Sequence, residues 1–228
     1  MVTTVDAILA VFSFPLFQVL GEQVSALEAF AFVTGALCVW AVSRQWLWNW
    51  PVGLLNNIAF FALFIASGLY ADSGLQVAFF VLGVYGWIAW LRRRRNGSAI
   101  ATAIPVRHAS RAEILIAIAI TAVGTILIAF LLSTETNSVV PWPDAFIASA
   151  SLVATWGQAR KIFEQWWIWI AVDVVSVPLY LTKGLALTAI LYVGFLALCI
   201  YGLVAWRREL RTPQFPAVKE SATSDALA

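Results

Sequence analysis

Long apolar stretches alternate with short polar segments along the chain, and this pattern predicts its elements. A helix of about 20 apolar residues crosses a hydrocarbon layer roughly 30 Å thick. Seven stretches meet or approach this length: residues 26–43, 50–67, 74–91, 113–132, 142–158, 165–182 and 185–205. Because 62% of the residues are hydrophobic and only 11% are charged, we predict an all-α integral membrane protein with seven spans.

The predicted helices form two similar units at a constant separation of 116 residues. Residues 29–92 and 145–208 align without a gap and share 17 identities over 64 positions, among them Trp50 with Trp166. Each unit holds three spans, so two units in direct succession would have opposite orientations. The additional span 113–132 restores the orientation, which predicts two parallel three-helix repeats plus a linker helix, a 3+1+3 plan.

Basic residues are concentrated on one side of the predicted spans. If the first span starts outside, 13 of the 14 Lys and Arg residues fall on the inner side, and only Lys183 falls outside. Short cytoplasmic loops of membrane proteins hold such an excess of basic residues. We therefore expect an external N-terminus and a cytoplasmic C-terminus. The net charge of +2 is explained by this anchoring, so binding of nucleic acid is not expected.

These patterns divide the chain into five segments. Within the first segment, the interrupted apolar stretch 5–20 is predicted to form a helix that lies in the outer interface. The last segment is rich in Pro, Ser, Ala and Thr, which is typical of a disordered tail. The predicted segments are 1–24 (external and interfacial), 25–95 (first repeat), 96–140 (cytoplasmic loop and linker helix), 141–211 (second repeat) and 212–228 (cytoplasmic tail).

No catalytic or metal-binding motif is visible in the sequence. Cys38 and Cys199 lie inside spans at non-equivalent positions, so packing is their expected role. His108 is the only histidine and is predicted to be a solvated loop residue. The sequence also lacks a glycine-rich phosphate loop and a nucleophile elbow. We predict a protein that is not an enzyme and that needs no metal or cofactor.

A polar stripe in the sixth span is the strongest candidate for ligand binding. Its members follow helical spacings of 3, 4, 3 and 4 and share one face: Trp166, Trp169, Asp173, Ser176 and Tyr180. Burying a carboxylate in a membrane costs about 2.5–3.5 kcal/mol even on the milder insertion scale, so Asp173 must be compensated. It either pairs with a donor of a neighbouring helix, becomes protonated, or faces a wet cavity and attracts a cation. The neighbouring aromatic residues favour the last interpretation.

The repeat offset pairs Asp173 with Asn57, which directly follows Asn56. Adjacent helical residues point about 100° apart, so one amide can line a cavity while the other bonds a neighbouring helix. Gln76 in the third span is a similar candidate. Its side chain both donates and accepts hydrogen bonds, which suits a carboxamide or a ribose hydroxyl.

Several short motifs occur together in a fixed order. They are Trp50-Pro-Val-Gly-Leu-Leu-Asn56, Gly68-Leu-Tyr-Ala-Asp72, Gln76 with the aromatic residues after it, Tyr85-Gly86-Trp87, Ala159-Arg160-Lys161, the spacing of Trp166, Trp169 and Asp173, Val177-Pro-Leu-Tyr180, and Lys183-Gly184-Leu185 followed by Thr188 and Tyr192. In these motifs the chain resembles the PnuC family of bacterial vitamin transporters over nearly all of residues 25–208.

The resemblance implies a full-length fold like that of the sugar-transporting SWEET proteins. It also implies a homotrimer in the inner membrane, with one pathway in each protomer. Transport would be facilitated diffusion, after which a cytoplasmic kinase phosphorylates the vitamin and traps it. The candidate substrate-binding residues are Asn56, Asn57, Gln76, Trp166, Trp169, Asp173, Tyr180 and Tyr192.

Among the vitamins that the family carries, the chemistry of these residues favours nicotinamide riboside. This molecule is a pyridinium cation with a carboxamide and ribose hydroxyls, which match an acid, tryptophans and amides. Thiamine is also cationic, whereas neutral riboflavin would make less use of Asp173, and both remain alternatives. A transporter coupled to protons or sodium through Asp173 or Glu28 is a further alternative. A membrane scaffold without transport activity would leave the polar stripe unexplained.

Overall fold

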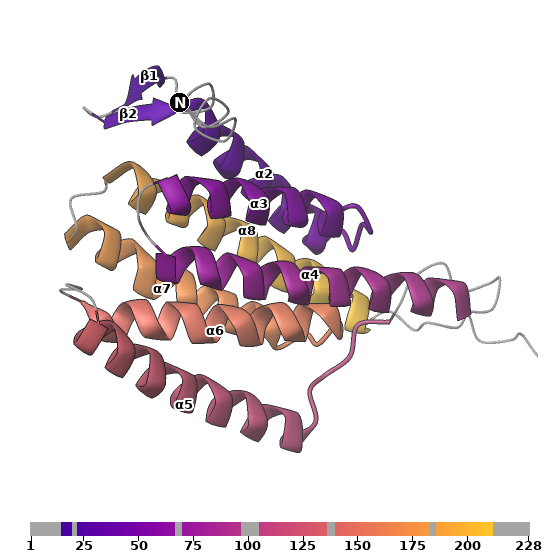
Figure 1. The fold of residues 1–228 in the computed structure, drawn as a ribbon. Coiled ribbons are helices and arrows are strands. Elements are labelled where there is room, and N and C mark those ends of the chain that lie inside the picture. The colour runs from indigo at the N-terminus through magenta and orange to yellow at the C-terminus, as the bar shows by residue number, and fades with distance from the viewer. Residues whose placement is uncertain are drawn as a thin grey trace, which may run out of the picture.

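A computed structural model describes residues 15–19, 22–66, 70–96, 105–135, 140–182 and 186–211. These residues hold seven helices and one β-hairpin (Figure 1). The elements are β1 Pro15–Val19, β2 Glu22–Ser25, α2 Ala26–Ser43, α3 Asn49–Ala66, α4 Tyr70–Asn96, α5 Arg111–Glu135, α6 Pro141–Ala159, α7 Gln165–Thr182 and α8 Ala186–Arg211. Most of the predicted external segment, Lys183 and the predicted tail 212–228 lie outside the described residues.

The seven helices confirm the helical prediction for all seven apolar stretches. The differences are largest at the ends of α4 and α8, which continue beyond the predicted spans into arginine-containing turns. An apolar stretch ends where the hydrocarbon ends, whereas a helix can continue among polar groups. Pro141 stands in the first turn of α6, where its missing N–H costs little.

Three described helices are long and apolar enough to cross a membrane: Ser73–Arg92 within α4, all of α5, and all of α8. The apolar part Ala29–Ser43 of α2 is shorter. Helices α3, α6 and α7 have 18 or 19 residues and include amide, hydroxyl or carboxyl side chains. Such polar groups are accommodated in a membrane when they face the interior of a bundle.

Residues 15–25 form an antiparallel hairpin, so the predicted interfacial helix is wrong for residues 15–19. In the hairpin Phe17 is opposite Val24 and Val19 is opposite Glu22. Aromatic and β-branched residues favour strands, and Pro15 stands at the first strand position, where no N–H is needed. The earlier part of the predicted helix lies outside the described residues.

Six helices form a closed ring, and the seventh packs outside it (Figure 1). Around the ring, α2 packs on α3 and α8, α4 packs on α3 and α6, and α7 packs on α6 and α8. Helix α5 packs against the outer side of α6. At this contact a Cβ on Gly124 would lie 2.9 Å from the Cβ of Ser149, and the hydroxyls of Thr125 and Ser149 hydrogen-bond at 3.0 Å. Glycine therefore permits the close approach of the two helices.

The segment before α5 is tied to the turn between α6 and α7. The Arg107 N–H donates to the Lys161 carbonyl at 3.1 Å, and the Phe163 N–H donates to the Arg107 carbonyl at 2.9 Å. The Arg107 guanidinium also pairs with Glu113 in the first turn of α5 at 2.7 Å. Backbone and side-chain contacts together fix the start of α5 on the second half of the ring.

Candidate functional site

A cavity of about 230 Å³ lies inside the ring of six helices. All six ring helices contribute to its wall, whereas no residue of α5 lines it. The lining residues are Gly35, Cys38, Val39, Val42, Asn49, Trp50, Gly53, Leu54, Asn57, Phe79, Gly83, Ser151, Thr155, Gln158, Trp166, Trp169, Val172, Asp173, Tyr192, Phe195 and Cys199.

Most of these residues form pairs with the 116-residue separation of the sequence repeat. The pairs are Gly35 with Ser151, Val39 with Thr155, Val42 with Gln158, Trp50 with Trp166, Gly53 with Trp169, Asn57 with Asp173, Phe79 with Phe195, and Gly83 with Cys199. Corresponding positions of the two halves of the ring therefore face a common space. Trp50 matches Trp166 and Phe79 matches Phe195, whereas the residues of the other six pairs differ, so the two sides of the cavity are chemically unequal.

Asp173 on α7 is the acidic residue of this wall. Its exposed fraction is 3%, and its Oδ2 atom has no hydrogen-bond partner. The Cys199 thiol of α8 hydrogen-bonds to the carboxyl group, and a thiol is a weak donor. Among the described residues, no Lys or Arg side chain lines the cavity. Because a buried carboxylate needs a partner, Asp173 offers a strong acceptor to a ligand with a positive charge or a hydrogen-bond donor.

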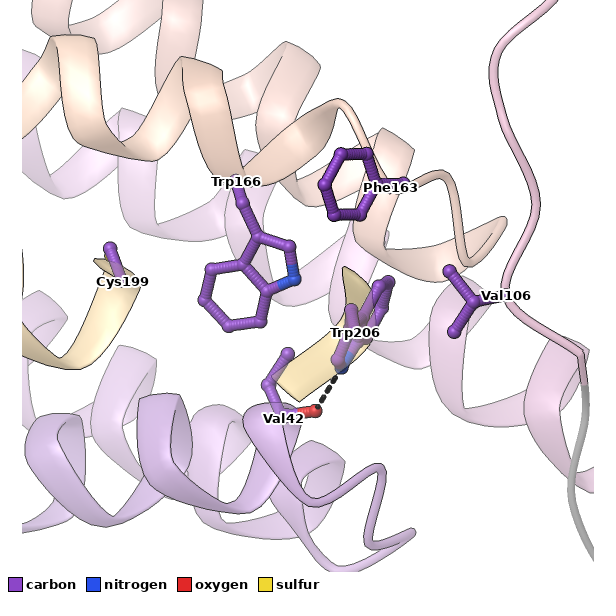
Figure 2. Close-up of a cluster of buried hydrophobic side chains, with 6 residues drawn as sticks. All are labelled: Val42, Val106, Phe163, Trp166, Cys199 and Trp206. Atoms are coloured by element: carbon purple, nitrogen blue, oxygen red, sulfur yellow. Dashed lines mark hydrogen bonds between the residues drawn. The ribbon is translucent and has the colours of Figure 1, made fainter. Parts of the chain in front are cut away.

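Two tryptophan clusters of nearly identical geometry border the cavity. Trp50 packs edge-to-face on Trp90, with ring centroids 5.4 Å apart and planes at 86°. Trp166 packs on Trp206 at 5.5 Å and 89°. Figure 2 shows the nitrogen edge of the Trp166 ring turned toward Trp206 and away from Cys199. The buried indole N–H groups of Trp50 and Trp166 lack a conventional acceptor, and the edge-to-face geometry suits an N–H···π contact.

Each cluster depends on a glycine of the neighbouring helix. A Cβ on Gly86 would lie 2.1 Å from Cη2 of Trp50, and a Cβ on Gly202 would lie 2.3 Å from Cη2 of Trp166. Both distances are far below a van der Waals contact. We call Trp50, Gly86 and Trp90 the first tryptophan cluster, and Trp166, Gly202 and Trp206 the second tryptophan cluster.

The outer indoles of the clusters connect the two halves of the ring. The Nε1–H of Trp90 on α4 donates to the Ala159 carbonyl at the end of α6, at 3.2 Å. The Nε1–H of Trp206 on α8 donates to the Val42 carbonyl at the end of α2, also at 3.2 Å (Figure 2). Each bond fixes the last helix of one half to the first helix of the other half.

A polar contact joins the halves directly at the same end of the bundle. Gln45 and Lys161, which are 116 residues apart, both adopt left-handed backbone conformations with φ of 56° and 53°. The Lys161 ammonium donates to the Gln45 side-chain oxygen, and the Gln45 amide donates to Glu209. Lys161 is 2% exposed and lies 4.4 Å from the ring centroid of Trp90. This layer of side chains joins the two halves at the end of the ring that carries the basic residues.

Five of the eight predicted site residues line the cavity: Asn57, Trp166, Trp169, Asp173 and Tyr192. Tyr180 lies behind them, because its ring packs on Tyr192 with centroids 4.9 Å apart. Gln76 on α4 is half-buried and is not among the lining residues.

Asn56 occupies the contact between α2 and α3. Its Nδ2 donates to the Ala31 carbonyl at 2.6 Å and to the Thr34 hydroxyl at 3.0 Å. These bonds hold the two helices together. Of the two adjacent amides, only Asn57 reaches the cavity, which is the division of roles that the angle between neighbouring helical residues allows.

Several polar lining residues were not among the predicted site residues. Helical spacings of 4 and 3 on α6 separate Ser151, Thr155 and Gln158. This spacing places them on one face of the helix, so the sequence alone could have identified them. Asn49 lies near them, with its Oδ1 3.5 Å from the Gln158 Nε2. Cys199 was assigned a packing role, and its contact with Asp173 depends on the packing of α8 against α7.

Comparisons with known proteins agree with the predicted resemblance. Residues 25–208 match the model of the nicotinamide mononucleotide transporter family. The riboflavin/roseoflavin transporter RibM of Streptomyces davaonensis is 35% identical over 177 residues, which cover 77% of this chain and 82% of RibM. The nicotinamide riboside transporter PnuC of Escherichia coli is 27% identical over 215 residues, which cover 84% of this chain and 89% of PnuC.

A solved structure has the same fold. The crystal structure of the vitamin B3 transporter PnuC aligns with a TM-score of 0.65 and 24% sequence identity, and covers 81% of each chain. The sequence relatives are transporters and not enzymes, and the chain is likewise a transporter. The chain thus belongs to the nicotinamide mononucleotide transporter family, the PnuC family of membrane vitamin transporters.

Proposed function

We propose that this protein carries a B vitamin across the membrane by facilitated diffusion, with nicotinamide riboside as the leading substrate. The observation that supports this choice is the buried Asp173 carboxylate, whose Oδ2 has no partner inside an aromatic cavity. The pyridinium ring of nicotinamide riboside carries a positive charge. A carboxylate attracts this charge, and each good contact with a tryptophan face adds about 0.5–2 kcal/mol.

The proposed ligand contacts follow the positions of the side chains in the wall. Trp166, Trp169, Asp173 and Tyr192 face the positive ring, and the Asn57 amide on the opposite side bonds to the carboxamide or a hydroxyl. Asn57 and Asp173 occupy equivalent positions on α3 and α7, so a ligand between them meets an amide on one side and an acid on the other.

Three further residues are proposed to act beside these contacts. Gln76 lies one helical turn before the lining residue Phe79, so it shares the face of α4 that meets the ribose. Tyr180 positions Tyr192 through ring packing, and Asn56 fixes α3 on α2 through its bond to the Ala31 carbonyl.

The size of the cavity also supports a small vitamin. Pockets for drug-sized molecules enclose about 300–1,000 Å³. At about 230 Å³ this cavity is smaller, which favours one six-membered ring with one ribose over the three fused rings of a flavin.

Riboflavin is the second candidate, because RibM has the higher identity of the two reported relatives. A neutral flavin would rely on stacking against the aromatic wall and would leave the charge of Asp173 unused. Thiamine is cationic and would use Asp173 and the tryptophans as nicotinamide riboside does. The substrates therefore differ in their expected dependence on this one carboxylate.

We also propose the 3+1+3 architecture with two parallel repeats, in which α5 is the linker helix. The paired lining residues, the two matched tryptophan clusters and the position of α5 outside the ring support it. Transport would then occur by rocking of the two halves about the central cavity. Domain limits at residues 25–95 and 141–211 follow from the same proposal.

The expected location is the bacterial inner membrane, with the N-terminus outside and the C-terminus in the cytoplasm. The distribution of Lys and Arg residues supports this orientation. A homotrimer with one pathway per protomer, and trapping by a cytoplasmic vitamin kinase, follow from the family resemblance. No further energy source is needed if phosphorylation keeps the internal concentration of the free vitamin low.

Purified protein in liposomes tests the substrate assignment directly. Equal concentrations of labelled nicotinamide riboside, thiamine and riboflavin are offered, and the initial uptake is measured against protein-free liposomes. Selective uptake of nicotinamide riboside supports the proposal, whereas selective uptake of riboflavin or thiamine assigns that vitamin instead. Under facilitated diffusion, an imposed inward proton or sodium gradient leaves the final internal concentration of the vitamin unchanged. Accumulation that depends on such a gradient, together with coupled ion flux, would instead indicate an ion-coupled transporter.

A further inference from the structure

A second cavity lies outside the ring, between α5 and the pair α6 and α7. Its volume is about 720 Å³, roughly three times that of the central cavity. Helix α5 touches α6 closely near Gly124, and the two helices separate toward the start of α5 (Figure 1). The walls are formed mainly by Ile, Ala, Val and Phe side chains. We call this space the α5 groove.

One polar side chain lies in the wall of the α5 groove without a partner. Gln165, the first residue of α7, is 1% exposed, and neither its Nε2 nor its Oε1 has a hydrogen-bond partner. Each buried polar atom left without a partner costs about 1–3 kcal/mol. The Gln165 N–H in this position is satisfied if a molecule in the groove supplies an acceptor.

The length of the α5 groove matches one leaflet of a bilayer. Along α5 its lining extends from Glu113 to Ile126, which corresponds to about 20 Å of helix. Half of a bilayer, including its headgroup region, measures about 20–22 Å. Trp156 and Trp167 also line the groove, and tryptophans favour the depth of the lipid headgroups and ester groups.

Charged residues of both signs surround the mouth of the groove. Glu113 pairs with Arg107 at 2.7 Å and approaches Arg160 at 3.7 Å. Glu164 pairs with His108 at 2.8 Å, so this exposed histidine has a specific partner. The hydrogen bond from Arg107 to Glu113 raises the pKa of Arg107, whose guanidinium is positive at physiological pH. Adjacent positive and negative groups complement a zwitterionic headgroup, because arginine binds phosphate and a carboxylate binds an ammonium.

We propose that the α5 groove binds one zwitterionic glycerophospholipid, such as a phosphatidylethanolamine, from the leaflet on the basic side of the protein. An acyl chain lies between α5 and α7, and a glycerol ester carbonyl accepts a hydrogen bond from the Gln165 Nε2. The phosphate lies beside Arg107 and the exposed Arg111. This site is separate from the central cavity and does not depend on the identity of the vitamin.

Native mass spectrometry of the delipidated protein tests the site. Palmitoyl-oleoyl phosphatidylethanolamine is titrated in one series, and phosphatidylglycerol with the same acyl chains in a second series. Gln165→Leu removes the amide at similar size, and Ala117→Phe fills the groove. Ala119→Phe is the matched control, because Ala119 is exposed on the same helix and does not line the groove. We expect one tightly bound phosphatidylethanolamine in the parent and in Ala119→Phe. Loss of the one proposed hydrogen bond in Gln165→Leu weakens binding roughly 2- to 13-fold.

Three other results would overturn the proposal that the α5 groove binds a zwitterionic lipid. Equal binding by the parent and by Ala117→Phe would show that lipid adheres nonspecifically, and the proposal would be abandoned. Tighter binding of phosphatidylglycerol would overturn the zwitterionic assignment in favour of an anionic lipid. If Ala117→Phe changes the oligomeric state while the lipid count stays constant, a second copy of the chain occupies the groove instead. If Gln165→Leu fails to fold, the lipid binding of Ala117→Phe still tests the proposal.

Discussion

The two halves of the ring share a packing motif but differ in the chemistry that they present to the cavity. The first and second tryptophan clusters agree within 0.1 Å in centroid separation, with ring planes at 86° and 89°. In contrast, the cavity position held by Asn57 in the first half is held by Asp173 in the second, and Gly53 corresponds to Trp169. The identical positions of the two clusters hold helices together, whereas several neighbouring cavity positions differ between the halves. We infer that the second half supplies most of the recognition of a cationic ligand.

The largest expected effect comes from removing the acid that distinguishes the halves. Asp173→Asn makes the two cavity positions alike and eliminates a charged hydrogen-bond acceptor, which contributes about 1.5–3 kcal/mol. Binding of nicotinamide riboside is expected to weaken roughly 10- to 150-fold in calorimetric titration. Riboflavin binding, if present, should change much less, because the flavin is neutral.

Exchanging the two residues provides the matching control. The double variant Asn57→Asp with Asp173→Asn keeps the total charge and moves the acid to the half without Trp169. Affinity should remain low if the acid and the tryptophan act together. Affinity equal to the parent's would contradict the inference that the halves have unequal roles.

The tryptophan clusters should respond alike in the two halves. Gly86→Ala places a Cβ 2.1 Å from the Trp50 ring, and Gly202→Ala places one 2.3 Å from the Trp166 ring. Each variant is expected to lower the free energy of unfolding by about 1–3 kcal/mol. Thermal unfolding of the detergent-solubilised protein measures this loss. Gly74→Ala on α4 and Gly194→Ala on α8 are the controls, since a Cβ at either position meets no atom within 4 Å. Similar losses at all four positions would rule out the specific role of the clusters.

A smaller effect is expected from the second difference between the halves. Trp169→Ala removes an aromatic face that contributes about 0.5–2 kcal/mol, so cation binding should weaken roughly 2- to 30-fold. Trp167→Ala is the matched control because that ring is 55% exposed and lines the α5 groove instead of the cavity. If both variants lost the same affinity, a general effect on α7 would replace the proposed ligand contact.

The smallest expected effect on vitamin affinity concerns the polar contact between the halves. Gln45→Met keeps the size of the side chain but removes the bonds to the charged groups of Lys161 and Glu209, and each hydrogen bond to a charged group contributes about 1.5–3 kcal/mol. Chemical unfolding should show a loss of this order, and the vitamin affinity should stay constant because Gln45 does not line the cavity. An unchanged unfolding midpoint would show that the contact contributes nothing to stability.

The helices were predictable from sequence because each apolar stretch ends at turns or charged residues, and α2 and α7 agree with their predicted limits at both ends. The hairpin at Pro15–Ser25 was not predicted. Its apolar residues were too few to form a span, and their pairing depends on backbone hydrogen bonds between strands, which periodicity in a single stretch does not reveal.

Candidate site residues were predictable from sequence where their spacing within a single helix places them on one face. The stripe containing Trp166, Trp169 and Asp173 needed only the spacing within α7. Asn56 and Asn57 could not be separated by spacing, because the contact of Asn56 with Ala31 depends on where α2 packs. Cys199 could not be connected with Asp173 before the contact between α7 and α8 was known.

The attachment of Arg107 to the α6–α7 turn has a mechanical consequence. Backbone hydrogen bonds at Arg107, its ion pair with Glu113 and the close contact at Gly124 couple the start and the middle of α5 to the second half. When the halves move relative to each other, α5 should travel with α6, α7 and α8 as one rigid body. If the halves rock as proposed, the motion of the transporter reduces to that of two unequal blocks, one of three helices and one of four.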